Sequence, residues 1–464
     1  MAPEPTGSAL TARPYTGRMP ARSGDLAVET HGIAPVPPGN RYGTARRLFT
    51  VWFAPQVNMT VIFTGSLAVA LGLGFWLGLV AMVIGTVLGS VAVAYLSTWG
   101  PRTGTAQLPN ARMAFGSWVA VVAVIQWLSS IAWDGLVGLF GGEALAALLG
   151  LPFWVAVAIV LAMQGAVGVF GYEVIHRMQA VMTVALGITF AVFAIRLLAG
   201  HQIVVGPTLA GADLAGAFVM EVTIALSLGI SWASYASDFS RYLPTSTSRT
   251  AVFGYTLAGL ASAYIAVQAI GIAAGETLAD QSSEGVRTVM GGGLLGGLAL
   301  LAIALGSVAS NGMNDYSGSL ALQTVGVRIR RPVSAAIVAV MAFGLIMWLH
   351  AGDLAARFQG VLLVVSYWIP AFVAIVTIDW RRRSVGRDVV NPALEDTSRA
   401  DALAALVSFV IAFAAAVPFM HTEVFVGPVS RLLHGADMAY FVNFLVAAVI
   451  YGGYRAVAKN RSRA

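Results

Sequence analysis

Long apolar runs separated by short polar linkers are the main feature of this sequence. A helix that crosses a bilayer needs about 20 mostly apolar residues, because each residue adds about 1.5 Å. The sequence therefore predicts an all-α polytopic membrane protein with twelve transmembrane helices. The predicted spans are Leu48–Leu71, Phe75–Thr98, Ser117–Gly141, Leu151–Phe170, Met178–Ala199, Leu214–Ser237, Ala251–Ala274, Gly291–Thr324, Pro332–Leu349, Leu354–Ile378, Ala400–Met420 and Ala436–Val457.

Two segments depart from the pattern of one apolar run per helix. The eighth run is longer than one span requires and is rich in Gly, Ser and Asn. We therefore expect it to be an interrupted or strongly tilted helix. Residues 1–47 are rich in Pro, Gly, Arg and Ser and contain no apolar core, so we interpret them as a cytoplasmic tail and not as a cleaved signal peptide.

The composition agrees with a surface that faces lipid. Hydrophobic residues make up 58% of the 464 residues and charged residues only 10%, whereas a soluble domain usually carries roughly 25% charged residues. These proportions exclude a soluble globular protein and a disordered chain. The sequence contains no cysteine, which excludes disulfides, a thiol nucleophile and a cysteine-ligated metal.

The basic residues predict the orientation in the membrane. If the amino terminus is cytoplasmic, all but four of the 27 Lys and Arg residues fall on the cytoplasmic side. The positive-inside rule then predicts that both termini are cytoplasmic in the cell membrane. The same spread over many loops argues against nucleic-acid binding, because it forms no basic stripe. The four exceptions are Arg196, Arg287, Arg357 and Arg431.

Three polar or glycine-rich segments lie inside predicted spans, at residues 53–60, 227–234 and 306–317. A proline such as Pro55 removes a helical hydrogen bond, and inside a membrane the freed carbonyls need polar partners. Breaks at matching places in the first and sixth spans predict two five-helix halves. In transporters built from inverted repeats, such breaks form the substrate and ion site near the bilayer midplane. Ordinary proline and glycine kinks are the alternative.

The third span presents polar side chains on one face. Gln126, Ser130 and Trp133 are three or four residues apart, so they share a helix face. An indole can stack on a planar ring, and an amide can read the donors and acceptors of that ring. We therefore predict that these residues bind substrate. For Trp133, the alternative is a tryptophan of the membrane-interface belt.

The acidic residues Asp134, Glu221 and Asp238 fall within or at the end of spans. A carboxylate at Asp134 is costly in the bilayer, and two roles stay open, a proton carrier and a structural hydrogen-bond acceptor. Glu221 is expected to reach the membrane interface from the outer half of the sixth span. Asp238 is expected to form a latch or a helix-end pair with Arg241, which gives this pair a gating role.

The eighth span carries amides next to small residues. Asn311 and Asn314 are predicted to bind substrate, because an amide offers two donors and an acceptor to the edge of a nucleobase. A weak site for Na⁺ made only of oxygen ligands is also predicted in this region. Its residues are Ala309 and Ser310 together with the backbone carbonyls from Ala54 to Val57.

The sequence does not predict an enzyme. The histidines are scattered without an H-E-x-x-H motif, and neither a G-x-S-x-G elbow nor a phosphate loop is present. The single lysine, Lys459, lies in the carboxyl-terminal tail, which excludes Schiff-base chemistry inside the membrane. We therefore predict no cofactor, and an ion gradient has to drive any uphill movement.

Several motifs resemble those of a known family, the nucleobase–cation symporters, in their purine–cytosine permease branch. The resemblance runs from about residue 25 to the carboxyl terminus. The segments that carry it are Glu29–Pro37, Val51–Pro55, Gly100–Gln107, Arg112–Gly116, Ser231–Pro244 and Asn311–Ser317.

The resemblance implies a LeuT-like fold of two inverted five-helix repeats plus two further helices. It implies import of a nucleobase or a related ring, coupled to Na⁺ or H⁺. The implied divisions are residues 48–199 for the first repeat, 214–378 for the second, 379–399 for a cytoplasmic loop, 400–457 for the last two helices and 458–464 for the tail.

The resemblance also implies roles for single residues. Trp133 corresponds to the stacking aromatic of the third span, and Ser130 lies where some members carry a substrate-binding Gln. The second stacking aromatic of some members aligns near Gly229, so Trp232 is expected to substitute for it. Asn314 corresponds to the amide that contacts the base. The cation-site positions fall near Ala309 and Ser310.

The leading hypothesis is a secondary active transporter that imports cytosine, a purine or a related heterocycle by alternating access. The expected partners are this small molecule and the lipid bilayer. One alternative is the same fold carrying hydantoin, allantoin, uracil or a thiamine-like substrate. A more remote alternative is a polytopic membrane enzyme or receptor.

Overall fold

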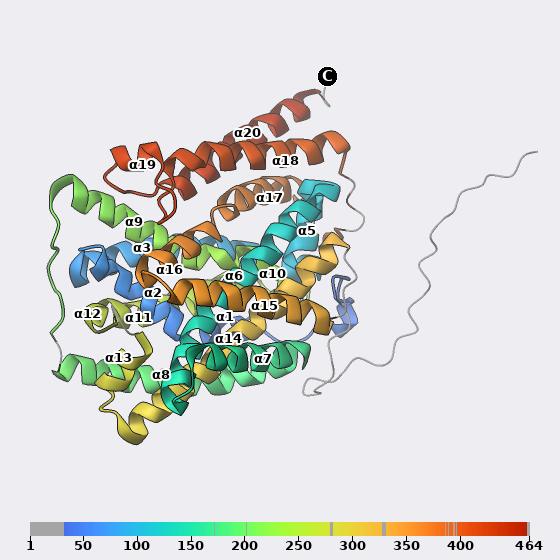
Figure 1. Cartoon of the computed structure of the whole chain (residues 1–464). Coiled ribbons are helices and arrows are strands. Elements are labelled where there is room, and N and C mark those ends of the chain that lie inside the picture. Colours follow the sequence, from blue (N-terminus) through green and yellow to red (C-terminus); the bar gives the residue numbers. More distant parts are fainter. Residues whose placement is uncertain are drawn as a thin grey trace, which may run out of the picture.

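The fold is that of a computed structural model, which describes residues 32–170, 172–200, 202–278, 282–326, 331–385, 387, 389–392, 395 and 397–461. The regular structure of these residues is helical (Figure 1), and their β interactions are limited to one isolated bridge between His421 and Val426. Most of the predicted amino-terminal tail and the motif at Glu29 to His31 lie outside the described residues.

The α-helices are α1 (Arg46–Phe53), α2 (Met59–Ala70), α3 (Gly74–Ser97), α4 (Gly100–Thr103), α5 (Gln107–Phe115), α6 (Val119–Leu149), α7 (Phe153–Phe170), α8 (Tyr172–Gly200), α9 (Gly211–Ile230), α10 (Ala236–Ser240), α11 (Arg249–Ala273), α12 (Gly275–Leu278), α13 (Ser282–Val289), α14 (Gly293–Val325), α15 (Arg331–His350), α16 (Leu354–Val364), α17 (Ile369–Arg383), α18 (Arg399–Ala416), α19 (Pro428–Leu432) and α20 (Ala439–Arg461). The 3-10 helices are η1 (Pro38–Asn40), η2 (Ala54–Gln56), η3 (Gly116–Trp118), η4 (Ser231–Tyr235) and η5 (Val417–Phe419).

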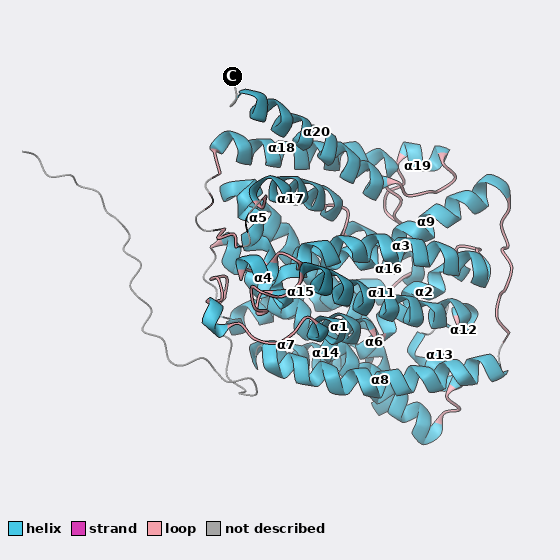
Figure 2. Ribbon diagram, turned by 180° about the vertical axis from the view of Figure 1, so that it is seen from behind, coloured by secondary structure: helices cyan, strands magenta, loops and turns pink. Residues whose placement is uncertain are grey.

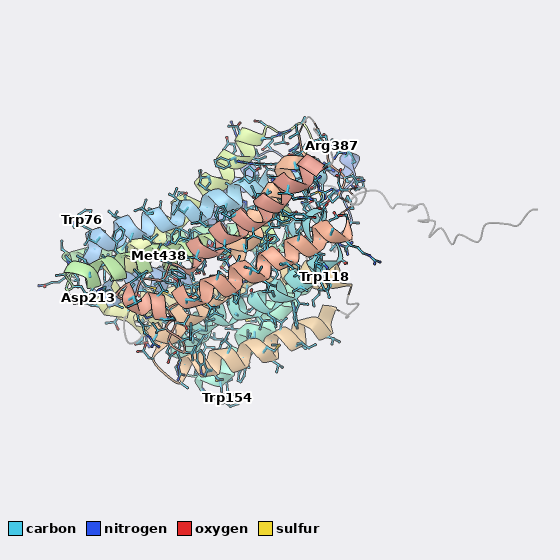
Figure 3. The ribbon with its side chains drawn as sticks, turned by 90° about the horizontal axis from the view of Figure 1, so that it is seen from above. Trp76, Trp118, Trp154, Asp213, Arg387 and Met438 are labelled. Carbon is cyan, nitrogen blue, oxygen red and sulfur yellow. The ribbon has the colours of Figure 1, made fainter. Side chains whose placement is uncertain are left out.

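The helices have the length and the surface of membrane-spanning elements. Nine helical stretches of the described chain are long and apolar enough to cross a bilayer, and the bent pair α1–α2 makes a tenth. Large apolar side chains are exposed on the outside, including Trp76 and Trp154 at the rim of the molecule (Figure 3). An apolar surface of this extent is typical of contact with lipid. The all-α polytopic membrane fold is therefore confirmed, while the count of twelve helices and the inverted repeats stay predictions.

The first span is broken where the sequence predicted a break. The turn η2 contains Pro55 and separates α1 from α2, and the two helices are bent by 65°. Asn58 caps α2, because its Oδ1 accepts a hydrogen bond from the backbone N of Val61 at 3.0 Å. Its Nδ2 donates to the carbonyl of Pro55 at 2.5 Å. These bonds satisfy backbone groups at the point where the helix is interrupted.

The sixth span also changes its geometry at the predicted place. α9 ends at Ile230, the 3-10 turn η4 follows, and α10 continues from Ala236. Ser231 is part of this turn, and its Oγ donates to the carbonyl of Leu228 at 2.8 Å. The segment contains no proline. The helix changes its geometry here through the tighter 3-10 winding, and not through a proline kink.

The eighth span is continuous, so an interruption at residues 306–317 is wrong, while the alternative of a strongly tilted helix stays a prediction. α14 runs without a break from Gly293 to Val325. Its small and polar residues serve packing against α6 instead, since the Ser307 Oγ donates to the carbonyl of Val137 at 2.7 Å. A Cβ added at Gly141 of α6 would lie 2.6 Å from that same hydroxyl. Small residues here allow a close helix–helix approach.

The tenth span contains a turn that the sequence analysis did not predict. α16 ends at Val364 and α17 begins at Ile369, with Pro370 in its first turn. The indole Nε1 of Trp368 donates to the carbonyl of Val365 at 3.0 Å and to the Ser129 hydroxyl at 3.1 Å. The short helices α4, α5, α12 and α13 in the linkers were not predicted either.

The two ends of the bundle carry different elements. α5 and the carboxyl-terminal end of α20 lie at one end, which we call the tail face (Figures 1 and 2). α12, α13 and α19 lie at the other end, which we call the α19 face. α18 and α20 run side by side along the edge of the bundle next to α17 (Figure 1).

Candidate substrate and ion site

The break of the first span meets the middle of α14. The Ser310 Oγ donates to the carbonyl of Pro55 at 3.2 Å, so the hydroxyl and the carbonyl predicted for a cation site lie together. All four predicted cation-site residues are buried. Hydroxyl and carbonyl oxygens are the ligands that broken helices offer to Na⁺. Cation binding itself stays a prediction. The four residues are Ala54, Val57, Ala309 and Ser310.

Aromatic side chains from α1 and η4 pack beside this break. The rings of Trp232 and Trp52 meet edge to face with centroids 5.8 Å apart, and Tyr235 lies at the same distance from Trp232. The Trp232 Nε1 donates to the Tyr264 hydroxyl of α11 at 2.8 Å. Gly229 lies against the backbone of α3, where an added Cβ would be 3.2 Å from the Cα of Gly89. Close packing therefore accounts for this glycine, and its substrate role stays a prediction.

The polar face of α6 turns toward η4, α16 and α14. The amide of Gln126 is buried and its Nε2 donates to the Tyr235 hydroxyl. The Ser129 hydroxyl donates to the carbonyl of Val365 at 3.0 Å, in the turn of the tenth span. Ser130 donates to its own helix, and its hydroxyl would be 2.8 Å from a Cβ at Gly318. The predicted face is thus directed into the bundle.

Trp133 is half-buried and packs against the hydrophobic core. This position differs from that of the strongly exposed Trp76 and Trp154 on the lipid-facing rim (Figure 3). This burial favours a position for Trp133 inside the bundle over one in the membrane-interface belt. Its stacking role stays a prediction.

Two buried amide groups near this cluster are unsatisfied within the described residues. The Gln56 Nε2 and the Gln126 Oε1 lack hydrogen-bond partners there. Gln56 lies in η2, one turn after Trp52, and Gln126 is bonded to Tyr235, whose ring is in contact with Trp232. A buried polar group without a partner costs about 1–3 kcal/mol. One buried donor in the break of the first span and one buried acceptor beside Tyr235 therefore lack a partner among the described residues.

A chain of amides connects α14 to α6 and α7. The Asn314 Nδ2 donates to the Asn311 Oδ1 at 3.2 Å. The Asn311 Nδ2 in turn donates to the Gln164 Oε1 of α7 at 2.8 Å and to the backbone carbonyl of Asp134 at 3.2 Å. Asn311 is therefore held between α14, α6 and α7, and the predicted substrate roles of Asn311 and Asn314 stay predictions.

Two acidic side chains lie in this part of the bundle. Asp134 of α6 is fully buried and interacts with Asp315 of α14 and with the amide of Gln164. Asp315 is half-buried. In the described part of the chain, groups of three or more His, Cys, Asp or Glu side chains placed to hold a metal ion are absent.

A hydrogen-bond network connects the helices at the tail face. Asp238 of α10 accepts from the backbone N of Gln107 in α5 and from the Ser317 hydroxyl of α14, both at 2.8 Å. Arg241 donates to the Tyr316 hydroxyl at 2.9 Å and to the carbonyl of Gly32 at 2.7 Å. The two predicted latch residues therefore interact electrostatically, and together they tie α10 to α5, α14 and the start of the described chain.

The α19 face holds a cavity of about 540 Å³. It is lined by residues of α2, α9 and α16 and by the segment around α19, including Met220, Gln359 and His421. Glu423 and His434 add polar groups to the lining. The described residues are thus cross-linked by hydrogen bonds at the tail face and hollowed at the α19 face.

Glu221 does not reach the membrane interface, so that expectation is wrong. Its side chain is fully buried in α9, and neither carboxylate oxygen has a partner among the described residues. The reason is the packing of α9 against α3, where a Cβ at Gly85 would lie 2.1 Å from the carbonyl of Val222. Hydropathy along the chain does not reveal this close contact.

Three site residues were not selected from the sequence. Gln164 lies in an otherwise apolar helix, and a lone amide in a predicted span was a usable signal. Gln56 follows Pro55 directly, so its place in the break was visible. Tyr235 gave no signal, because its hydrogen bond to Gln126 depends on the packing of η4 against α6.

Residues 35–443 match the family of permeases for cytosine and purines, uracil, thiamine and allantoin. The putative purine-cytosine permease YxlA of Bacillus subtilis (strain 168) is 24% identical over 444 residues, covering 92% of this chain and 95% of that protein. The purine-cytosine permease fcyB of Emericella nidulans is 24% identical over 452 residues, covering 92% of this chain and 88% of that protein.

The fold is similar to that of solved transporter structures. Mhp1 in an inward-facing conformation superimposes with a TM-score of 0.74 at 17% identity, covering 94% of this chain and 95% of Mhp1. Mhp1 in a closed conformation with bromovinylhydantoin bound, a nucleobase-cation-symport-1 family transporter, gives a TM-score of 0.70 at 18% identity, covering 94% of this chain and 97% of Mhp1.

Proposed function

We propose a specific transport activity for this chain, which belongs to the family of permeases for cytosine and purines, uracil, thiamine and allantoin, in the purine–cytosine permease branch of the nucleobase–cation symporters. Family membership makes it a membrane transporter and not an enzyme, as the sequence predicted. The activity is import of a nucleobase, cytosine or a purine, by cation-coupled alternating access.

The observation that carries this proposal is the pair of unsatisfied amide groups beside the aromatic cluster. The Gln56 Nε2 and the Gln126 Oε1 are buried and lack partners within the described chain. The ring edge of a nucleobase presents both acceptors and donors, so it offers the kind of partner that each group lacks. Satisfying each group recovers about 1–3 kcal/mol that its burial otherwise costs.

The base stacks on Trp133 and receives a hydrogen bond from Asn314. Trp133 is half-buried on the face of α6 that carries Gln126. Asn314 is held by Asn311 and so presents its amide at a fixed place. Stacking is tolerant of ring chemistry, whereas the amides discriminate between hydrogen-bonding patterns.

Alternating access is supported by the difference between the two faces. The Asp238 and Arg241 network cross-links helices at the tail face, and the α19 face has the cavity of about 540 Å³. With the tail face in the cytoplasm, as the basic residues predict, this arrangement corresponds to a state closed toward the cytoplasm. Import then requires the bonds between α10, α5 and α14 to open.

A coupling cation, Na⁺ or H⁺, supplies the free energy for accumulation. The oxygen ligands proposed for Na⁺ are the Ser310 hydroxyl and the backbone carbonyls of Ala54, Val57 and Ala309. In favour of this site, Ser310 is already within hydrogen-bond distance of the first span at its break.

The test is uptake into liposomes that contain the purified full-length chain. Cytosine, adenine, hypoxanthine, uracil and allantoin compete in turn against a labelled base, with and without Na⁺. We expect Trp133→Ala to reduce uptake at least tenfold, because it removes the stacking surface. Trp118→Ala is the matched control, since Trp118 is 43% exposed next to the start of the same helix.

Normal uptake by inserted Trp133→Ala protein removes this residue from the site. Absence of competition by every base contradicts a nucleobase substrate. A hydantoin is the second candidate, favoured by the superposition on Mhp1 with bromovinylhydantoin bound. Competition by a hydantoin, without competition by the bases, selects that alternative.

A further inference from the structure

Two carboxyl groups face each other in the interior of the bundle, one from α6 and one from α14. Asp134 is fully buried, and neither of its carboxyl oxygens has a hydrogen-bond partner at bonding geometry in the described chain. The buried Oδ2 of Asp315 is in the same situation. The two groups nevertheless interact with each other and with the amide of Gln164.

Among the described residues, the neighbouring helices bring no positively charged side chain to this pair. α7 contributes the amide of Gln164, and η4 contributes Tyr235, a neutral hydroxyl that also lies within range of Asp238. Arg112 of α5 donates instead to the carbonyl of Thr324. The side chains of the first turns of α8 lie outside the described residues. His350 of α15 stacks on Phe153 at the far end of α7.

Two adjacent carboxylates without a cation repel each other strongly in a medium of low dielectric constant. Burial in a membrane protein adds a desolvation cost to each charge. A single proton on one carboxyl oxygen removes the repulsion and supplies a donor to the oxygen of the other. The arrangement is therefore suited to bind and release one proton, and two carboxyl groups are too few to enclose a metal ion.

We propose that the coupling ion of this transporter is a proton, which binds to the Asp134–Asp315 pair. This proposal rests on the proposed transport function and names its driving ion. The proton adds to one carboxylate oxygen to give a carboxylic acid and leaves from the same group, so charge and atoms balance. The site is separate from the oxygen ligands at Ser310 and Pro55 that are predicted for Na⁺.

The pair is linked directly to the substrate amides. The Asn314 side chain interacts with Asp134 and donates to Asn311, which holds the backbone carbonyl of Asp134. A change in the charge of Asp134 therefore alters the hydrogen bonding of the amide that contacts the base. Substrate and proton are coupled through these bonds without a distant conformational relay.

The experiment uses the full-length chain in liposomes that contain a pH-sensitive dye. Labelled cytosine or hypoxanthine, whichever is transported, is offered under an imposed pH gradient at equal Na⁺, and then under a Na⁺ gradient at equal pH. Exchange of labelled for unlabelled base with no gradient is measured in parallel, because exchange requires substrate transport but no net proton movement.

We expect wild-type accumulation to follow the pH gradient, and base entry to acidify the lumen. Asp134→Asn and Asp315→Asn should each reduce pH-driven accumulation at least tenfold, and much more strongly than they reduce exchange. Asp315→Glu, which keeps the carboxyl group, should retain proton-driven accumulation. Glu221→Gln is the matched control, because it removes another buried, unpartnered carboxyl group in a different helix.

Accumulation driven by Na⁺ alone, without acidification, overturns the proton proposal and leaves the transport function intact. It is overturned equally if the Asn variants accumulate base like the wild type, or if only Glu221→Gln loses proton coupling. Absence of exchange by the wild-type protein contradicts the proposed function itself. Gel filtration of each variant separates loss of coupling from loss of folding.

Discussion

Asn311 ties three helices together, and its removal gives the most quantitative test of the packing around the site. Its side chain is fully buried. The Nδ2 donates to the carbonyl of Asp134 at 3.2 Å and to the Gln164 Oε1 at 2.8 Å, and the Oδ1 accepts from Asn314 at 3.2 Å. Asn311→Ala removes all three bonds and leaves their partners unsatisfied.

Hydrogen bonds between membrane helices contribute about 0.6 kcal/mol each on average. Three of them give a loss of about 2 kcal/mol in the free energy of unfolding, which is a change of about 30-fold in the ratio of folded to unfolded protein. The assay is equilibrium unfolding of the purified chain in mixed micelles with a rising fraction of dodecyl sulfate.

Ser319→Ala is the control for the Asn311 experiment. Ser319 lies in the same helix, but its hydroxyl donates only to the carbonyl of Tyr316 within α14, at 2.7 Å. We expect this variant to unfold close to the wild type. Equal stability of Asn311→Ala and Ser319→Ala would refute the reasoning. It would mean that the side-chain amide bonds between helices do not hold α14 in place.

Three further changes have defined outcomes. Gln126→Leu should raise the KM for uptake about tenfold, because it removes a hydrogen bond to the ligand; an unchanged KM would place the base elsewhere. Gly271→Ala should destabilise the protein by about 1–3 kcal/mol, because the added Cβ would lie 1.9 Å from a carbonyl oxygen of α2. Gly254→Ala is the control in the same helix. A Cβ at Gly254 would have nothing within 4 Å, so this variant should unfold like the wild type. Burial alone would raise the pKa of Glu395, but hydrogen bonds from two arginines outweigh burial and hold this pKa below its ordinary value of 4.5. Its carboxylate therefore stabilises the fold above pH 4.5. The difference in melting temperature between wild type and Glu395→Gln should be largest near pH 7 and shrink as the pH falls below 4.5. A difference in melting temperature that grows in acid would contradict this prediction.

Local signals in the sequence predicted the break of the first span. Pro55 cannot continue a helix, and Asn58 is a residue that caps one, so both effects act within a few residues. The polar face of α6 was also predictable, because helical periodicity alone places Gln126, Ser130 and Trp133 on one side.

Features that depend on contacts between helices were not predictable in this way. The polar residues of α14 suggested an unwound segment, yet Asn311 finds its partner in Gln164, more than a hundred residues earlier in the chain. Glu221 is buried because α9 packs closely against α3, which its own neighbours in sequence do not indicate. The turn before Pro370 was marked by a proline but lies within a predominantly apolar run.

A structure determined by electron cryo-microscopy with the best-competing base bound tests the site most directly. The account predicts density for a flat ring at the broken first span, stacked on Trp133 and in hydrogen-bond contact with Gln126 and Asn314. Density only in the cavity at the α19 face, or a ring more than one helix diameter from these three side chains, would contradict it.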